Sequence, residues 1–308
     1  MAGPLRTRIE QDMTKHTLGH IDTKLRGMLG RRTTFVIVEG SDDLAFYKRF
    51  LDISKTTSYY STKLNDEGKV QDGGCEELQI IVRTVLEEGR TEKIVGIMDT
   101  DYRKYLDGYQ YPHNIFHTDH RDMEMTALST PSVQQSLRRW IVGFDGIFDG
   151  LKVMLRHAGE LRILNDRYRL GCSFKKKVKI NCIFDTSTQR VVEHWRETYD
   201  GRFLKACLNK RKQTFMGALR TLSGLCKAVI FYLTHSFDRE SDYDVCQGHD
   251  TLQLLSLSLV DTATYSPDTI WEKCFDAYSI DDFKNTRLYA SLQAWAVLKN
   301  AVLVKDGF

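Results

Sequence analysis

Short, almost continuous apolar runs alternate with amphipathic segments over the first 130 residues. The apolar runs predict buried strands at 34–38, 57–61, 94–98 and 114–117. Apolar residues at helical spacing predict helices at 42–51 and 75–88, and an additional amphipathic helix over 9–29. Because strands and helices alternate, we expect an α/β fold with a parallel sheet and right-handed crossovers.

Beyond residue 130 the pattern becomes mainly helical. Thr130-Pro131 predicts a helix start with proline at the first helical position. The exception is the segment 162–192, where apolar residues at every second position (Val178, Ile180, Cys182, Phe184) indicate a strand. Further helices are predicted at 187–211, 213–235, 250–261, 267–278 and 281–301. We therefore expect an N-terminal helix within 1–30, an α/β domain at 31–130 and a mainly α-helical domain at 131–308.

Two of the predicted strands end abruptly in acidic residues. Glu39 closes the first strand, Gly40 permits a tight turn, and Asp43 falls in the first turn of the following helix, so both carboxylates can face one point. Asp99 and Asp101 follow the strand at 94–98 and share one side if the chain stays extended. Four oxygen ligands without a soft ligand favour Mg²⁺ or Mn²⁺ over Zn²⁺.

Each acidic motif has a structural interpretation when it is taken alone. A Glu-Gly pair at a strand end is usually a turn, an Asp near a helix start usually interacts with the helix dipole, and an isolated Asp-x-Asp is usually a solvated loop. Both motifs, however, follow near-continuous apolar strands of one predicted parallel sheet. Their joint occurrence favours a metal site over three unrelated structural features.

The same residues resemble a known family. Val38-Glu39-Gly40 with Asp43, then Asp99-x-Asp101 after a second hydrophobic strand, is similar to the Toprim domain of topoisomerases, primases and overcoming-lysogenization-defect nucleases. The resemblance covers roughly residues 31–128 and extends to Asn114–Asp119, Asp122-Met123-Glu124 and Gly248-His249-Asp250. It is strongest to stand-alone Toprim-related nucleases that accompany ATPases in bacterial anti-phage operons. This implies a Toprim-like parallel four-stranded sheet, flanked by helices, at 31–130.

The resemblance also implies an activity and partners. A metal-dependent phosphodiesterase would use two Mg²⁺ (or Mn²⁺) ions, and the Toprim glutamate, here Glu39, would have an acid/base role. The family implies a toxic anti-phage effector that cleaves host tRNA once released from a partner ABC-type or AAA ATPase of the same operon; this chain itself has no Walker motif. A homodimer is a further expectation. The metal ligands would be Glu39, Asp43, Asp99 and Asp101, and Glu124 would join them in the catalytic set.

Several other residues are weaker candidates. Arg103, Lys104 and Arg121 could neutralise charge on a scissile phosphate or be ordinary surface cations. Glu124 could equally be an acid at a helix N-terminus. Asp250 is predicted to be an N-cap, and His249 is a secondary site candidate.

The net charge of +3 conceals an uneven distribution of basic and acidic residues along the chain. Residues 138–227 carry 20 Lys and Arg against 8 Asp and Glu, a net +12, whereas 228–308 carry 6 against 12, a net −6. Such a basic block favours binding of a phosphate backbone, and interleaved aromatic residues could stack on unpaired bases, although any single one of these aromatics is more simply a core residue. The candidate contacts are Lys175, Lys176, Lys177, Lys179, Lys210, Arg211 and Lys212, interleaved with Trp140, Tyr168, Phe174 and Trp195.

Composition and motif content bear on the localisation and on the possible functions of the protein. Seven cysteines without a Cys-x-x-Cys pair, a start without a secretory pattern and the absence of a long apolar run predict a cytoplasmic protein. RNA, and tRNA in particular, is the favoured substrate. The alternatives are a Toprim DNA endonuclease or nickase and a non-catalytic nucleic-acid-binding regulatory subunit. A primase or topoisomerase is disfavoured, because no zinc-binding module or strand-passage domain is recognisable.

Overall fold

The computed structural model describes most of the chain with gaps. The described residues are 34–51, 57–61, 74–89, 91–106, 109–110, 113–174, 177–185, 188, 190–210, 215–235, 237, 240–259, 264–301 and 303. The helix predicted over 9–29 lies outside them. The chain divides into two compact units. The first comprises residues up to Asp99, Gln110–Asp119 and Ser279 onward, and the second comprises Thr100–Tyr109 and His120–Tyr278.

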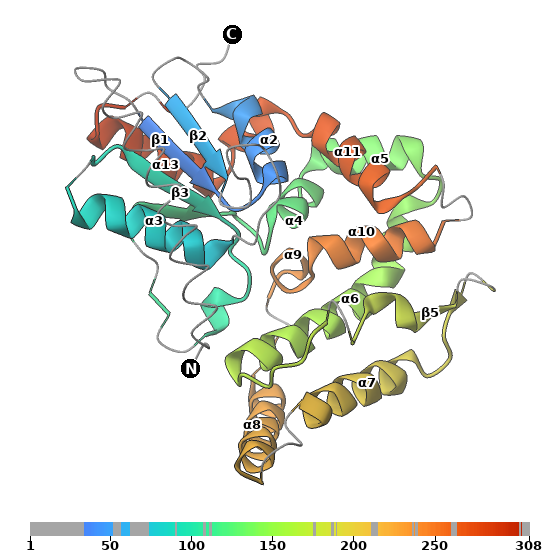
Figure 1. Ribbon diagram of the computed structural model, residues 1–308. Coiled ribbons are helices and arrows are strands. Elements are labelled where there is room, and N and C mark those ends of the chain that lie inside the picture. Colours follow the sequence, from blue (N-terminus) through green and yellow to red (C-terminus); the bar gives the residue numbers. More distant parts are fainter. Residues whose placement is uncertain are drawn as a thin grey trace. The chain divides into compact units, whose positions relative to one another are not determined.

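A parallel sheet forms the centre of the first unit (Figure 1). Its strands are β1 (Thr34–Val38), β2 (Thr57–Ser61), β3 (Ile94–Met98) and β4 (Ile115–His117), in the order β2-β1-β3-β4. All strand pairings are parallel. The first unit also contains α2 (Ser41–Phe50), α3 (Cys75–Glu87), α12 (Ile280–Lys284) and α13 (Arg287–Leu298). The predicted α/β class, with a parallel sheet and a mainly helical remainder, is confirmed.

Side-chain alternation places α3 against one face of this sheet. Phe35 and Ile37 of β1 share a core with one apolar stripe of α3, formed by Leu78, Ile81, Val82 and Val85. The spacing of that stripe is the helical period, so the helix buries it completely. Away from this core, α2 buries Phe50, on which Phe283 of α12 stacks at 5.1 Å between ring centroids. The C-terminal segment therefore contributes to the first unit.

The second unit is built largely from helices. They are α4 (Met123–Leu128), α5 (Pro131–Trp140), α6 (Phe144–Arg167), α7 (Trp195–Lys210), α8 (Phe215–Thr234), α9 (Asp242–Val245), α10 (Gly248–Leu257) and α11 (Pro267–Ala277). Short 3-10 turns η1 (Arg103–Tyr105) and η2 (Ile180–Ile183) and a small antiparallel pair, β5 (Phe184–Asp185) with β6 (Arg190–Val191), complete it. The helix α6 packs against α5, α8, α9 and α10. Among the described residues, no helix is long and apolar enough to cross a membrane.

Several element predictions differ from the structure. The strand expected from the alternation at 178–184 is the 3-10 turn η2 followed by the two-residue strand β5, and the first part of segment 162–192 belongs to α6. Val178, Ile180 and Ile183 are buried in and beside a tight turn that packs on α7 and α10. The alternating apolar pattern therefore arises from this turn and not from the predicted strand. The helix expected at 281–301 is broken into α12 and α13, because Thr286 caps the second helix. The predicted boundary at residue 130 falls inside the second unit.

Gly96 explains how closely α3 approaches β3. A Cβ atom there would meet Leu78 Cδ2 at 2.5 Å and side chains of Ile115 and Val82 at 3.3 Å. Since these neighbours are buried, the sheet can accept a larger residue only if the packed Leu78 side chain or the helix itself shifts.

We expect Gly96→Ala to lower the free energy of unfolding by about 1–3 kcal/mol through overpacking. Gly201→Ala is the matched control, because a Cβ at that helical glycine meets nothing within 4 Å, and it should stabilise by about 0.5–1 kcal/mol. Denaturant unfolding of both variants provides the measurement. Equal effects of the two substitutions would contradict the packing argument.

Candidate functional site

Glu39 and Asp99 lie at the same edge of the parallel sheet in the first unit. Glu39 directly follows β1 and Asp99 directly follows β3. These strands are neighbours, with Val38 paired to Ile97, so the two acids leave the sheet at almost the same level. Both residues are half-buried. The carboxyl edge of a parallel sheet is where α/β proteins usually bind ligands.

Asp43 is drawn back toward the same strand end. It is the third residue of α2, and its Oδ2 accepts a 2.7 Å hydrogen bond from the backbone N–H of Gly40. Gly40 directly follows Glu39, so the turn holds the Asp43 carboxylate one residue beyond Glu39. The structure thus brings Glu39, Asp43 and Asp99 to the sheet edge of the first unit.

Asp101 belongs to the second unit and has arginine partners there. Its Oδ2 lies 3.0 Å from Arg103 Nη1, and its Oδ1 lies 3.9 Å from Arg121 Nη2. The backbone turns at this residue, with φ +48°, and its N–H donates to the carbonyl of Arg121 at 2.7 Å. The condition for Asp99 and Asp101 to share a side, an extended chain, is therefore not met.

The cations predicted to face a scissile phosphate already have acidic or aromatic partners. Arg121 is 4% exposed and stacks on Tyr102, while burial lowers its pKa against the opposing effect of Asp122 and Asp101. Arg103 pairs with Asp101. A phosphate that used either arginine would have to compete with these contacts.

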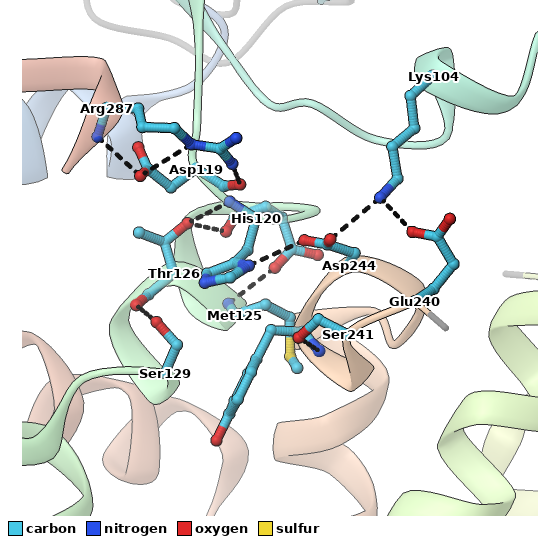
Figure 2. Close-up of polar contacts among 12 residues, drawn as sticks. Lys104, Asp119, His120, Met125, Thr126, Ser129, Glu240, Ser241, Asp244 and Arg287 are labelled. Atoms are coloured by element: carbon cyan, nitrogen blue, oxygen red, sulfur yellow. Dashed lines mark hydrogen bonds and ion pairs between the residues drawn. The ribbon is translucent and has the colours of Figure 1, made fainter. Parts of the chain in front are cut away.

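The third cation, Lys104, belongs to an ion-pair network (Figure 2). Its Nζ contacts Glu240 at 2.7 Å and Asp244 at 3.0 Å, and Asp244 also contacts His120 Nδ1 at 2.8 Å. Burial alone raises the pKa of the Asp244 carboxyl, but hydrogen bonds from His120 and Lys104 outweigh it, so the pKa lies below its ordinary value. The network fixes His120 and Lys104 to the start of α9 and the loop before it.

Asp122 joins two helices through one carboxylate. Its Oδ1 accepts from the N–H of Met125 at 2.9 Å, which caps α4, and its Oδ2 accepts from the N–H of Gly248 at 2.9 Å, the first residue of α10. A Cβ at position 248 would collide with Glu124 Cβ and with Asp122 Oδ1. Glycine is therefore required for the two helix starts to meet around this carboxylate. Glu124 occupies the first turn of α4, consistent with its structural interpretation.

The prediction that Asp250 caps a helix is wrong. The helix α10 begins two residues earlier, with Gln247 as N-cap, and Asp250 Oδ2 instead accepts from Arg162 Nη2 at 2.6 Å. The pairing with an arginine on α6 explains the difference, because a partly buried guanidinium forms a strong charge-assisted hydrogen bond with a nearby carboxylate. The two residues are 88 positions apart in the sequence, so the ion pair could not be predicted from the residues around Asp250.

Asp119 anchors the C-terminal helix to the end of β4 (Figure 2). Its carboxylate accepts from the N–H groups of Arg287 at 2.7 Å and Leu288 at 2.9 Å, while the Arg287 guanidinium donates to the Asp119 carbonyl. This contact assigns a structural role to one residue of the matched segment Asn114–Asp119. It also explains why α13 belongs to the first unit.

The basic block is described only in part. Lys177 and Lys179 are exposed, and Lys210 ends α7. Phe174 is 6% exposed and packs in the core. The side chain of Lys210 and the whole of Lys175, Lys176, Arg211 and Lys212 lie outside the described residues.

The donor chemistry at the sheet edge fits a hard divalent cation, since all its predicted ligands are carboxylates. Among the described residues, no three His, Cys, Asp or Glu side chains gather closely enough to hold a metal ion. The oxygens of Asp101 are paired with arginines of the second unit. Glu39, Asp43 and Asp99 therefore share the sheet edge and have the right donor chemistry, but their side chains are not close enough to hold a metal ion together.

Removing the shared cap tests its contribution. We expect Asp122→Ala to lower the free energy of unfolding by at least about 1–3 kcal/mol, because it leaves two buried N–H groups and Arg121 without their carboxylate. Ser266→Ala is the matched control, since Ser266 caps α11 alone, and it should cost about 1 kcal/mol. A loss at Asp122 no larger than at Ser266 in urea unfolding would contradict the double-cap interpretation.

The Asp244 contacts predict a pH effect. Because the pKa of this carboxyl is lowered in the folded protein, the contacts stabilise the fold above the ordinary Asp pKa of about 3.9 and lose their effect as the pH falls through the lowered value. Asp244→Asn should therefore make the free energy of unfolding less dependent on pH in this acidic range. Asp268→Asn in the first turn of α11 is the control, and identical pH profiles for the two variants would exclude the network as the cause.

Comparison with known proteins adds no family assignment. No family model matches this chain, and no curated protein matches it.

Proposed function

We propose that this chain is a Mg²⁺-dependent Toprim-type nuclease that acts as the toxic effector of a bacterial anti-phage system. The observation that carries the proposal is the placement of Glu39 and Asp99 at the ends of neighbouring parallel strands, with Asp43 turned back beside Glu39. Within this proposal the parallel sheet is a Toprim-like sheet. The likeness of the sequence motifs is strongest to the effector nuclease of the PARIS anti-phage system.

Three carboxylates at one sheet edge have a clear chemical use. Divalent ions held there would polarise a phosphodiester and generate a nucleophile from water. Glu39 follows the central strand β1 and is the residue we assign to proton transfer. The exposed Lys177 and Lys179 of the basic block support a polyanionic substrate.

By family analogy, the substrate is RNA, with host tRNA as the favoured target, and a partner ATPase holds the enzyme inactive. A DNA endonuclease or nickase is the alternative for the same site. Parallel assays on tRNA and plasmid DNA separate these two.

A non-catalytic nucleic-acid-binding regulatory subunit is the second candidate function. The observation that favours it is the pairing of Asp101 with Arg103 and Arg121. One of the four acids predicted to bind metal is therefore engaged in ion pairs instead. In that role the sheet-edge acids would contribute only to folding.

Nuclease assays on the purified full-length chain with Mg²⁺ test the proposal. We expect Glu39→Gln and Asp99→Asn each to lower the rate of tRNA cleavage by about 10²-fold or more, as loss of an acid/base group or a metal ligand would. Glu272→Gln, an exposed acid on α11, should cleave at the wild-type rate. Thermal unfolding of each variant shows whether the fold is retained.

Asp101→Asn distinguishes the two candidate functions further. If Asp101 binds a catalytic metal, this variant loses activity as Asp99→Asn does, and excess Mg²⁺ partly restores it. If Asp101 only pairs with arginine, activity per folded molecule is retained and stability falls. Undiminished cleavage by both Glu39→Gln and Asp99→Asn would reject the catalytic site.

A further inference from the structure

A cavity of about 520 Å³ lies within the second unit. None of the predicted catalytic acids is among its lining residues. Three parts of the chain line it: Arg162 of α6; Phe174, Lys179, Ile180 and Asn181; and Gln247, His249, Asp250 and Gln253 at the start of α10. Its size falls within the range of about 300–1,000 Å³ that is typical of small-molecule sites. The sheet-edge acids do not account for it, although one lining residue, Lys179, belongs to the basic block.

One end of the lining suits a phosphate group. The helix α10 starts here, and the N–H groups of His249 and Asp250 precede the first intrahelical hydrogen bond, which runs from Thr251 to Gln247. Lys179 is exposed on the lining and forms no ion pair with a described residue. Helix N-termini and unpaired lysines both favour anions.

The Arg162–Asp250 pair sets the charge of the cavity. Arg162 Nη2 donates to Asp250 at 2.6 Å, and its guanidinium lies 4.5 Å from the centre of the Phe174 ring. The pair neutralises itself, so the acidic residue in the lining does not cancel Lys179. The cavity therefore keeps a net positive charge beside a rigid, partly aromatic wall.

The other lining groups suit a heterocyclic base. Asn181, Gln247 and Gln253 each carry an amide with donors and an acceptor, the combination found on base edges.

We propose that this cavity binds a single nucleotide unit, with its phosphate at Lys179 and the start of α10 and its base against the three amides. The nucleotide can come from two sources, a free mononucleotide or one residue of a nucleic-acid strand. Only the strand source rests on the proposed nuclease function.

Isothermal titration calorimetry on the full-length chain in EDTA tests the proposal without catalysis. The probes are AMP, CMP, GMP and UMP, inorganic phosphate, and a short single-stranded RNA. We expect at least one mononucleotide or the RNA to bind with one site per chain, and inorganic phosphate to bind more weakly than the mononucleotides. Lys179→Glu should weaken the nucleotide binding by about tenfold or more, the loss of one charge-assisted contact with added repulsion.

Matched variants identify the site. Lys273→Glu reverses an exposed lysine on α11 that is outside the lining, and it should leave the affinity unchanged. Asn181→Ala removes an exposed amide of the lining and should reduce discrimination among the four bases without abolishing binding. Binding of mononucleotides identifies a free nucleotide as a sufficient ligand, whereas binding of RNA alone identifies the strand.

The outcomes separate this proposal from the nuclease proposal. No binding of any nucleotide probe, equal binding by Lys179→Glu and wild type, or phosphate binding as tight as nucleotide binding would overturn the cavity assignment. Cleavage that is lost in Glu39→Gln while nucleotide binding persists supports both proposals. Full cleavage by Glu39→Gln with Lys179-dependent binding would reject the nuclease site alone.

Discussion

Parallel pairing of β1 with β3 is the constraint on which the first unit depends. Because the two strands run side by side in the same direction, the residues that follow them must leave at one edge, and these are Glu39 and Asp99. Gly96 of β3 permits the close approach of α3, which covers one face of these paired strands. The position of the acids is thus a consequence of backbone hydrogen bonding and core packing, before any chemistry at the acids is considered.

The second unit depends on buried carboxylates that serve as links between helices. Asp122 holds the starts of α4 and α10, and Asp250 ties α10 to α6 through Arg162. Both links meet at the first turn of α10, which also borders the cavity. The unit places a helix N-terminus there, at which Asp122 accepts from the Gly248 N–H, while the N–H groups of His249 and Asp250 have no acceptor among the described residues. Electrostatic links of this kind define positions more sharply than apolar contacts do.

Local patterns in the sequence predicted the strands and most helices. Buried strands and amphipathic helices both produce a regular spacing of apolar residues over a short stretch of sequence. The acids after β1 and β3 were placed correctly at strand ends for the same reason. The partner of Asp250 was not predictable, because Arg162 lies 88 residues away. Asp101 pairs with Arg103, two residues along the chain, because the backbone turns at Asp101 instead of staying extended. The alternating apolar residues near Ile180 led to a wrong strand prediction, because the 3-10 turn found there also buries apolar residues of this segment. Asp43 and Glu39 show that a local turn can be read from sequence, whereas charge pairing across the fold cannot.

The contact of Asp119 with the start of α13 has a consequence for the order of folding. These partners lie 168 residues apart, and nearly the whole second unit is encoded between them. During synthesis the chain emerges from its N-terminus, and long-range contacts form after local ones. The helical unit can therefore fold while the sheet still lacks its final helix. The sheet is therefore completed only after the helical unit has been synthesised, and the proposed catalytic edge gains the support of α13 only after that point.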